Sequence, residues 1–284
     1  MKSIKVGGVP EHFNFPWHIC LEKGLLKEQN LDVTWTDFDG GTGELCRALH
    51  AKEIDVALVL TEGIIKEIED GSPFKIIQEY IASPLIWGIH VAANSSYQHM
   101  NDLEKTTSAI SRYGSGSHLM TYVNAKYQQW DPKNLKFEVV NNLDGAVEAL
   151  PKDEAQYFMW EHFTTKPLVD NGTFRRIADC PTPWPCFMIV STEQFIAKNS
   201  TELKEMLEVI NGVSKDFKEI PRISRLLAER YQQNEEDILK WLDLTEWSQK
   251  QIKPEEVLTV QNQLYDLGLI AQKSDYEDIC QSVS

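Results

Sequence analysis

The pattern of apolar and polar positions switches repeatedly between a period of two and a helical period over the first 90 residues. Ile4 and Val6 alternate with polar neighbours, as in a strand. Residues 55–60 form a nearly continuous apolar run, which is typical of a parallel strand covered on both faces. Between such runs, apolar residues recur at helical spacing. This alternation predicts a parallel sheet with helices on both faces.

A second unit with the same alternation follows. Its predicted elements are a short strand at 109–110, a glycine-serine turn at 114–118 that opens a helix, and strands at 137–140 and 157–160. The apolar run at 187–190 predicts a strand that returns to the first unit. Beyond residue 200 the pattern is helical and amphipathic, so this region is expected either to cover the first unit or to form a dimer face.

Composition narrows the class of protein. The 284 residues are 42% hydrophobic and 25% charged, which supports packed cores in one large or two medium domains. The net charge of −15 offers no basic face for nucleic acid. No stretch reaches the roughly 18 apolar residues of a membrane span, so membrane insertion is not expected.

Two features bear on the compartment. The first residues run directly into strand-like alternation without an apolar signal core, and the five cysteines are scattered and odd in number. Both favour a reducing compartment. The expectation is therefore a cytoplasmic protein, with a periplasmic mature form from which a signal peptide was removed as the alternative.

A series of short motifs in a fixed order adds a family resemblance. Each motif is weak alone, but their order and spacing together resemble the type-2 periplasmic-binding-protein superfamily. Within it, the chain is similar to the substrate-binding proteins for sulfonates, nitrate, taurine and thiamine-precursor pyrimidines. The resemblance covers roughly residues 1–195, and its motifs are Lys23-Gly24-Leu25-Leu26, Asn30-Leu31-Asp32-Val33, Asp39-Gly40-Gly41-Thr42-Gly43, Glu53-Ile54-Asp55-Val56-Ala57, Gly71-Ser72-Pro73, Pro84-Leu85-Ile86-Trp87-Gly88, Gly114-Ser115-Gly116-Ser117 and Tyr157-Phe158-Met159-Trp160-Glu161.

The resemblance implies an α/β protein of two lobes. Each lobe would hold a mixed, mostly parallel sheet flanked by helices, with a helical extension at the C-terminus. It implies a discontinuous first lobe at 1–91 and 185–284, an inserted second lobe at 92–184, a ligand cleft between them and hinge closure. The missing signal peptide makes an ABC-transporter partner doubtful.

One branch of the superfamily, the fungal thiamine-pyrimidine synthase, consumes its own active-site histidine and uses a cysteine-rich loop with iron. Cys180 and Cys186 are not part of such a cluster, so that reaction is not expected here.

Candidate site residues follow from the rule that ligands bind beyond the carboxyl ends of parallel strands. The glycine and serine loops offer backbone N–H groups to an anion, although ordinary helix capping explains them as well. Aromatic rings near strand ends suit a planar heterocycle or a cation, with core packing as the alternative. Glu62 and Glu161 each follow an apolar strand and suit a ligand amine, or else compensate a helix N-terminus. The full candidate set is His12, Phe13, Phe15, Gly40, Gly41, Thr42, Gly43, Thr61, Glu62, Trp87, Ser115, Gly116, Ser117, His118, Trp160, Glu161 and Trp184.

Several kinds of catalytic and cofactor chemistry lack their motifs. There is no zinc-type histidine spacing, no phosphate P-loop and no nucleophile elbow. No metal, cofactor or catalytic residue is therefore predicted. The favoured function is a soluble binder of a small molecule, a pyrimidine or thiamine-precursor-like heterocycle. The alternatives are a binder of a small oxyanion such as a sulfonate or nitrate, and a cytosolic enzyme of thiamine-pyrimidine or related cofactor metabolism that would draw on His12 and His118. A homodimer is possible on the helical C-terminal face.

Overall fold

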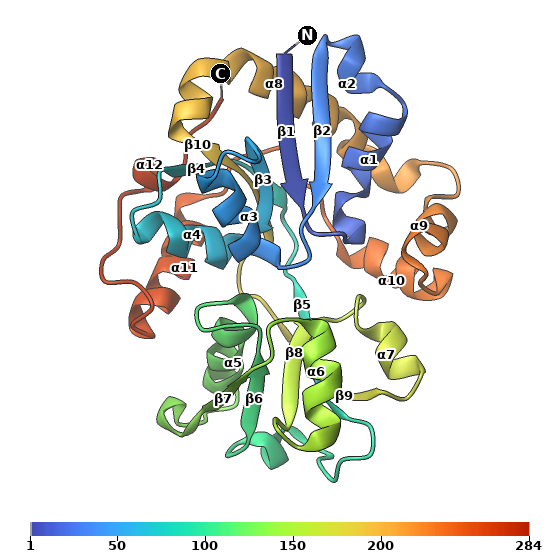
Figure 1. The fold of residues 1–284 in the computed structure, drawn as a ribbon, viewed down its shortest axis with the longest axis vertical. Helices are drawn as coiled ribbons and strands as arrows, with labels where there is room; N and C mark the ends of the chain where they lie inside the picture. Colours follow the sequence, from blue (N-terminus) through green and yellow to red (C-terminus); the bar gives the residue numbers. More distant parts are fainter. Residues whose placement is uncertain (1, 284) are drawn as a thin grey trace. The chain divides into compact units, whose positions relative to one another are not determined.

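The computed structural model describes residues 2–283 and divides them into two compact units. Unit 1 comprises the chain up to Pro84 and again from Trp184 onwards, and unit 2 is the segment Leu85–Pro183. Each unit has its own five-stranded sheet flanked by helices (Figure 1). The predicted fold class, a two-lobed α/β protein with mixed sheets and a helical C-terminal region, is confirmed.

The sheet of unit 1 has the order β2-β1-β3-β10-β4. Its strands are β1 (Lys2–Gly8), β2 (Leu31–Asp37), β3 (Val56–Leu60), β4 (Phe74–Ile81) and β10 (Phe187–Thr192). Strand β1 pairs in parallel with β2 and β3, whereas β10 is antiparallel to both β3 and β4. Strands β1, β2, β3 and β4 therefore run in the same direction, and β10 is reversed. The carboxyl ends of these four strands lie at the same end of the sheet.

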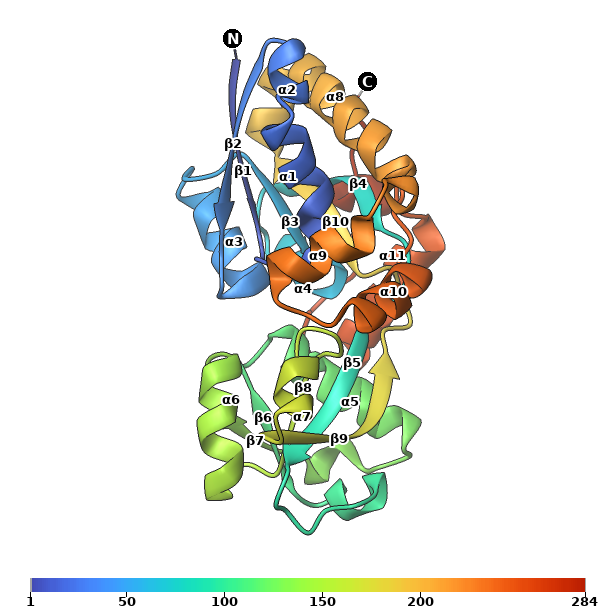
Figure 2. The same ribbon diagram turned by 90° about the vertical axis from the view of Figure 1, so that its right-hand side faces the viewer.

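Helices cover both faces of this sheet. The crossovers place α1 and α2 on one face and α3 and α4 on the other, as right-handed connections require. The long helix α8 lies beside α1 and α2 (Figure 2), and its buried residues Leu203, Met206, Leu207 and Ile210 follow the predicted amphipathic register. The helices of unit 1 are η1 (His12–Asn14), α1 (Phe15–Glu22), α2 (Leu25–Glu28), α3 (Gly41–His50), α4 (Thr61–Glu69), α8 (Glu193–Lys215), η5 (Phe217–Glu219), α9 (Ile223–Tyr231), α10 (Glu235–Leu244), α11 (Pro254–Asp266) and α12 (Tyr276–Ile279).

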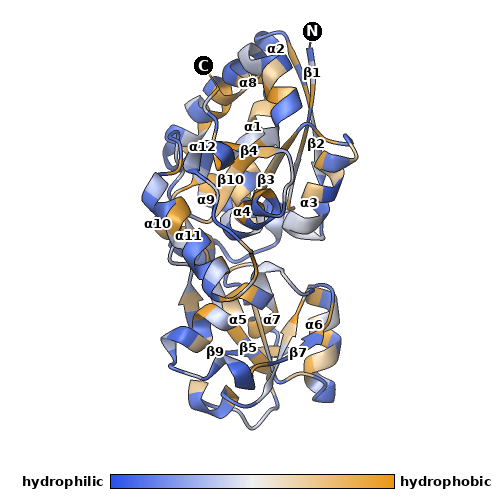
Figure 3. Cartoon of the chain, turned by 90° about the vertical axis from the view of Figure 1, so that its left-hand side faces the viewer, coloured by the Kyte–Doolittle hydropathy of each residue, from blue (hydrophilic) through white to orange (hydrophobic). Residues whose placement is uncertain are grey.

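The C-terminal region belongs to unit 1. Strand β4 lies at the edge of its sheet, and two C-terminal segments pair with it, through Trp247 opposite Ile81 and Cys280 beside Ile76. These segments satisfy backbone groups that an edge strand otherwise leaves open. Strands β3 and β10 are coloured as apolar in Figure 3, as expected of strands covered on both faces. Among the residues described, no helix is both long and apolar enough to span a bilayer.

The sheet of unit 2 has the order β7-β6-β8-β5-β9, which repeats the topology of unit 1 with β5 in the place of β10. Its strands are β5 (Ile86–Ala92), β6 (Thr107–Ile110), β7 (Lys136–Val139), β8 (Tyr157–Glu161) and β9 (Phe174–Pro181). Strand β5 is antiparallel to β8 and β9, while β6 is parallel to β7 and β8. Four strands again run one way and one is reversed.

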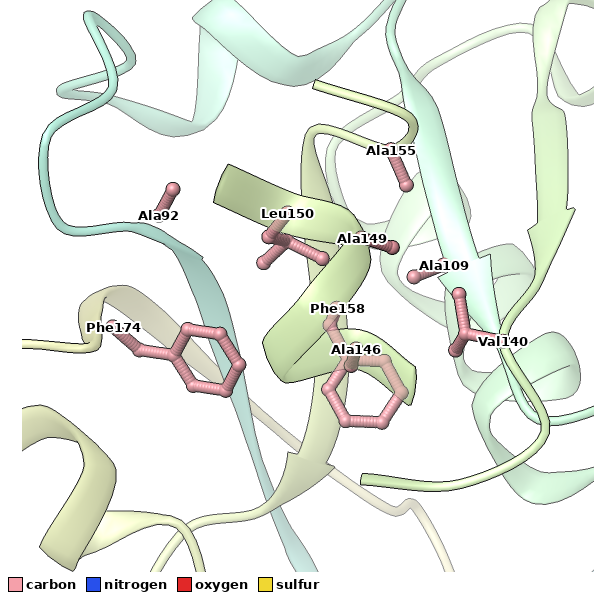
Figure 4. Packing of buried hydrophobic residues seen from close by; sticks show 9 residues of the cluster. All are labelled: Ala92, Ala109, Val140, Ala146, Ala149, Leu150, Ala155, Phe158 and Phe174. Carbon is pink, nitrogen blue, oxygen red and sulfur yellow. The ribbon is translucent and has the colours of Figure 1, made fainter. Parts of the chain in front are cut away.

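One apolar core cluster of unit 2 contains two phenylalanines. Phe158 of β8 and Phe174 of β9 pack with Leu150 and with a group of alanines on one face of the sheet (Figure 4). The helices of this unit are η2 (Met100–Leu103), α5 (Gly116–Tyr127), η3 (Pro132–Asn134), α6 (Leu143–Ala149), η4 (Leu150–Lys152) and α7 (Lys166–Asp170).

The structure divides the chain at other positions than the sequence analysis did. The first crossing, expected between 91 and 92, falls between Pro84 and Leu85, because β5 pairs on both sides with strands of unit 2. The second, expected between 184 and 185, falls one residue earlier, so Trp184 belongs to unit 1. Strand β9 was not predicted, since two arginines and an aspartate interrupt the apolar residues between Phe174 and Pro181 and leave no regular alternation.

Candidate functional site

In unit 1 the chain turns from β3 into α4 at Thr61, a fully buried residue. The N–H of Thr61 donates to the carbonyl oxygen of Cys186 at 3.1 Å, and its hydroxyl donates to the carbonyl oxygen of Pro185 at 2.5 Å. These bonds fasten the first turn of α4 to the segment that precedes β10. Because its single hydroxyl proton is used, Thr61 can offer a ligand only a lone pair.

Glu62 is the next residue and is 2% exposed. The Oε2 atom accepts a hydrogen bond from Nε1 of Trp184 at 2.9 Å, across 122 residues of sequence. The Oε1 atom is buried and has no hydrogen-bond partner among residues 2–283. Burial raises the pKa of Glu62 from 4.5 to about 7, because the lost hydration outweighs the hydrogen bonds that it receives. Two predicted site residues thus meet, and one carboxylate oxygen stays available.

The loop after β1 leads into η1, which carries His12 and Phe13. The His12 ring lies 4.2 Å from the Trp241 ring, and Phe13 lies 5.2 Å from Phe187, measured between ring centroids. Burial lowers the pKa of His12 to about 3, so the ring is neutral at physiological pH. Phe15 starts α1 and packs edge-on against Phe217 at 6.1 Å. All three predicted residues lie in one buried aromatic cluster.

The glycine loop opens α3, as its sequence predicts. Its helix begins at Gly41, which has a φ of +64°, a value that favours glycine. The N–H of Gly40 donates to Oε2 of Glu44 at 2.7 Å, and Oγ1 of Thr42 accepts from the N–H of Leu60 at 3.0 Å. Gly43 is buried in the first turn. An anion at this loop would meet the carboxylate of Glu44, a residue outside the predicted set.

In unit 2 the serines at the start of α5 bond to one another. Ser115 caps the helix, and its hydroxyl accepts from the N–H of His118 at 3.3 Å. The hydroxyl of Ser117 accepts from the N–H of Ser111 at 3.0 Å and lies 3.0 Å from the hydroxyl of Ser115. Gly116 is the first residue of the helix. Ser111 was not predicted; its only signal was its position directly after the short strand β6.

His118 has one ring nitrogen engaged. Its Nδ1 atom accepts a hydrogen bond from the N–H of Gly114 at 3.1 Å, so the neutral ring carries its proton on Nε2. Burial lowers the pKa of His118, and the ring packs edge-on against Phe137 at 4.7 Å and Tyr122 at 5.2 Å. In this state His118 can donate a hydrogen bond through Nε2 but cannot accept a proton through Nδ1.

Glu161 ends β8 and stands opposite Trp87 of β5 in the sheet register. Its Oε2 atom accepts from the N–H of Thr164 at 2.5 Å, and burial raises the pKa of its carboxyl group. The indole Nε1 of Trp87 and the hydroxyl of Thr164 are buried without hydrogen-bond partners in the described part of the chain. Trp160 faces elsewhere and stacks on Phe158, with ring centroids 5.2 Å apart.

The predicted residues therefore form separate groups. Unit 1 brings together Thr61, Glu62 and Trp184, while unit 2 brings together Ser115, Ser117 and His118 and, in a second group, Trp87 and Glu161. No group of three or more metal-ligating side chains occurs within residues 2–283. The residues of these groups can form hydrogen bonds and pack aromatic rings around buried carboxyl groups.

Comparison with known proteins defines the fold family of this structure. The structure has the periplasmic-binding-protein fold. The family model described as Ca3427-like PBP matches residues 87–180, which is less than half of the chain. The Candida albicans CA3427 gene product, described as defining a new family with the generic periplasmic binding protein structural fold, aligns with a TM-score of 0.90 and 22% identity, covering 100% of this chain and 97% of that one.

Two further solved structures share the fold. The alkanesulfonate-binding protein SsuA from Xanthomonas axonopodis pv. citri, bound to MOPS, has a TM-score of 0.83 and 12% identity, covering 99% of each chain. The periplasmic nitrate-binding protein NrtA from Synechocystis PCC 6803 has a TM-score of 0.71 and 15% identity, covering 96% of this chain and 83% of that one. No curated protein matches by sequence. These comparisons establish the fold of the chain.

Proposed function

We propose that this protein binds a small molecule that carries an N–H donor or a cationic nitrogen, and that Glu62 receives that group. The observation that supports the proposal is the buried carboxyl group of Glu62, in which Trp184 engages Oε2 while Oε1 has no partner among the described residues. Buried carboxylates without a partner are costly, so a ligand donor at Oε1 would complete the group.

An aminopyrimidine-like heterocycle fits this requirement. Such a ring is flat and carries an exocyclic amine next to a ring nitrogen, so it can donate to a carboxylate and pack against indole and phenyl rings. Trp184 supplies an indole in contact with Glu62. A protonated ring nitrogen would strengthen the bond, since hydrogen bonds between charged groups are roughly twice as strong as neutral ones.

A small oxyanion is the second candidate, because SsuA and NrtA are named for sulfonate and nitrate binding. In this chain the donors for an oxyanion would be Nε2–H of His118, the indole N–H of Trp87 and the hydroxyl of Thr164. Two features of unit 1 oppose it. Glu44 occupies the N–H of Gly40, and Glu62 adds a second carboxylate at the same edge of the sheet. We therefore rank the heterocycle first.

The family resemblance stated from the sequence adds a hypothesis about motion. We propose that residues of both units contact the ligand and that binding draws the units together by a hinge movement. Small-angle X-ray scattering tests this idea directly. The radius of gyration should fall when saturating ligand is added. An unchanged radius of gyration would contradict the hinge movement and would indicate that the ligand binds to one unit alone.

Thermal shift and calorimetry with a matched panel test the ligand class. The panel contains 4-aminopyrimidine derivatives, their analogues without the amine, and the oxyanions sulfonate, nitrate and phosphate. Ligand at about 100 times its dissociation constant should stabilise the protein by about 2.7 kcal/mol. We expect the aminopyrimidines alone to do so. Stabilisation by oxyanions only would favour the second candidate, and appearance of a new product mass would indicate an enzyme.

A further inference from the structure

Three side chains from separate parts of unit 1 meet at His12. His12 belongs to η1, Tyr231 is the last residue of α9, and Trp241 lies in α10. The His12 ring lies 4.2 Å from the ring of Trp241 and 6.0 Å from that of Tyr231, between centroids. Both α9 and α10 lie on the α1 side of the unit-1 sheet (Figures 1 and 2). The C-terminal helices thus bring two rings to the loop that follows β1.

The polar atoms of these three rings have no hydrogen-bond partner within residues 2–283. They are Nε2 of His12, the hydroxyl of Tyr231 and Nε1 of Trp241, and all three are buried. His12 and Trp241 are each 1% exposed. Buried polar atoms are nearly always hydrogen-bonded, so a group of unpartnered ones at one place calls for a ligand or an ordered water.

The backbone around His12 is held firmly, so loose packing does not account for these atoms. The carbonyl oxygen of Phe13 accepts hydrogen bonds from the hydroxyl of Tyr80 at 2.8 Å and from Nε1 of Trp247 at 3.3 Å. The side-chain amide of Asn14 donates to the carbonyl oxygen of Val9 at 2.8 Å. The same element therefore satisfies its own backbone and leaves the His12 ring nitrogen unpaired.

The three rings carry no charge at physiological pH. Burial lowers the pKa of His12 to about 3 and raises that of the Tyr231 hydroxyl. The Arg230 guanidinium, which favours the ionised form of the neighbouring Tyr231 hydroxyl less than burial disfavours it, donates to Glu22 at 2.7 Å and lies over the Phe15 ring. The indole N–H can only donate, whereas the phenol can both donate and accept. The group that completes this cluster must therefore include a hydrogen-bond acceptor for the indole N–H.

The topology relates this cluster to Glu62. Strands β1 and β3 are parallel neighbours in the sheet, so the loop that carries His12 and the turn that carries Glu62 leave the same edge. We propose that His12, Tyr231 and Trp241 form a second, uncharged subsite of the ligand site, which takes a hydroxyl or carbonyl group of the ligand. This inference rests on the proposed function and adds a second recognised group to it.

A double comparison of variants and probes tests the subsite. The probes are 4-aminopyrimidine bearing a 5-hydroxymethyl group and the 5-methyl analogue, which lacks the hydroxyl. The variants are Tyr231→Phe, which removes the hydroxyl and keeps the ring, and Trp241→Phe, which removes the indole N–H and replaces the indole by a smaller phenyl ring. Trp247→Phe is the matched control, because its N–H is already bonded to the backbone at Phe13. Dissociation constants are measured by calorimetry, and thermal melts confirm that each variant folds.

We expect Trp241→Phe and Tyr231→Phe each to weaken the hydroxymethyl probe by about 3- to 10-fold, the size of one hydrogen bond, and to leave the methyl probe unchanged. The free Tyr231→Phe variant should melt at or above the wild-type temperature, since an unpartnered hydroxyl has been removed. Free Trp241→Phe should melt lower, because the smaller ring leaves a cavity. Trp247→Phe should lower the melting temperature and affect both probes equally.

The outcomes separate the two proposals. If neither probe binds the wild-type protein, the proposed function fails and the subsite with it. If both probes bind and Glu62→Gln weakens them, but Trp241→Phe and Tyr231→Phe do not distinguish them, only the subsite is overturned and ordered water fills it. An equal loss for both probes would also overturn it, because that result reports packing and not a hydrogen bond to the hydroxyl.

Discussion

The two units share one topology but treat their buried glutamates differently. Glu62 follows β3 and Glu161 ends β8, and these strands hold the same central place in the two sheets. Each glutamate is accompanied by a tryptophan close to the reversed strand, Trp184 before β10 and Trp87 in β5. In unit 1 the indole bonds to the carboxylate, whereas in unit 2 the N–H of Thr164 does so and the indole of Trp87 has no partner.

The two glutamates therefore differ in how their carboxylates are bonded: Glu161 bonds within its own turn, whereas Glu62 keeps one oxygen without a partner in the described chain. Glu161 accepts a hydrogen bond from the backbone three residues later and so closes its own turn. Glu62 depends on a side chain 122 residues away and keeps one oxygen unpaired. Equivalent positions in equivalent sheets thus present an acceptor in unit 1 and an N–H donor in unit 2. Four predictions test whether this distinction holds.

The largest effect expected concerns pH and stability. Below pH 4.5 Glu62 is protonated in both the folded and unfolded states, and above about 7 it is ionised in both. Its raised pKa therefore destabilises the folded state increasingly as the pH rises through this interval. The free energy of unfolding of Glu62→Gln, minus that of the wild type, should rise by about 3 kcal/mol between pH 4.5 and 8.

The wild-type free energy is subtracted because two buried histidines also make stability depend on pH. The pKa values of His12 and His90 fall to about 3 and about 4, so these residues make the folded state more stable as the pH rises, opposite to Glu62. Urea denaturation across pH gives both free energies. Glu161→Gln should show the same sign with a smaller change, since Thr164 stabilises its carboxylate. If the difference in free energy of unfolding between Glu62→Gln and the wild type did not change with pH, the pKa of Glu62 would not be raised by burial.

The second effect concerns ligand affinity. Glu62→Gln removes the charge at Oε1 but keeps an oxygen for Trp184. It should weaken an aminopyrimidine probe by about 10- to 100-fold, as expected for a hydrogen bond to a charged group. Glu161→Gln should produce a smaller loss. Calorimetry on the two variants measures both, and equal losses would mean that the two units contribute equivalent carboxylates.

The third comparison replaces the two tryptophans. Trp184→Phe and Trp87→Phe each replace a buried indole by a smaller phenyl ring and leave a comparable cavity. Trp184→Phe also removes the indole N–H that bonds to Glu62, whereas the Trp87 N–H has no partner in the described chain. Trp184→Phe should therefore destabilise the protein by about 2 kcal/mol more than Trp87→Phe at pH 8. Thermal denaturation is the measurement. Equal losses in the two variants would show that the Trp87 N–H is bonded as well.

The smallest expected change in the free energy of unfolding comes from the loops at the starts of α5 and α3. Ser117→Ala leaves the buried N–H of Ser111 without its acceptor and should cost about 1–2 kcal/mol. Thr42→Ala likewise removes the acceptor of the Leu60 N–H, but Thr42 is only half-buried and water can replace it, so about 0.5 kcal/mol is expected. Chemical denaturation compares the two, and a larger loss in Thr42→Ala would reverse this ranking.

Much of the fold follows from local sequence alone. The apolar run that forms β3, the glycine turn at Gly41 and the cap at Ser115 each depend on residues close in sequence. The amphipathic register of α8 likewise gives its buried face. Local patterns also placed Glu62 and Glu161 directly at strand ends, because a polar residue after an apolar run marks the point where a strand leaves the sheet.

Only the tertiary structure decided which of these residues meet. The burial pattern of β5 resembles that of β4, and periodicity reports that a strand is buried without naming its neighbours, so β5 was assigned to the wrong side of the crossing. The bond between Trp184 and Glu62, and the contact of His12 with Tyr231 and Trp241, join segments more than a hundred residues apart. Such contacts depend on strand order and helix packing, which local propensity does not specify.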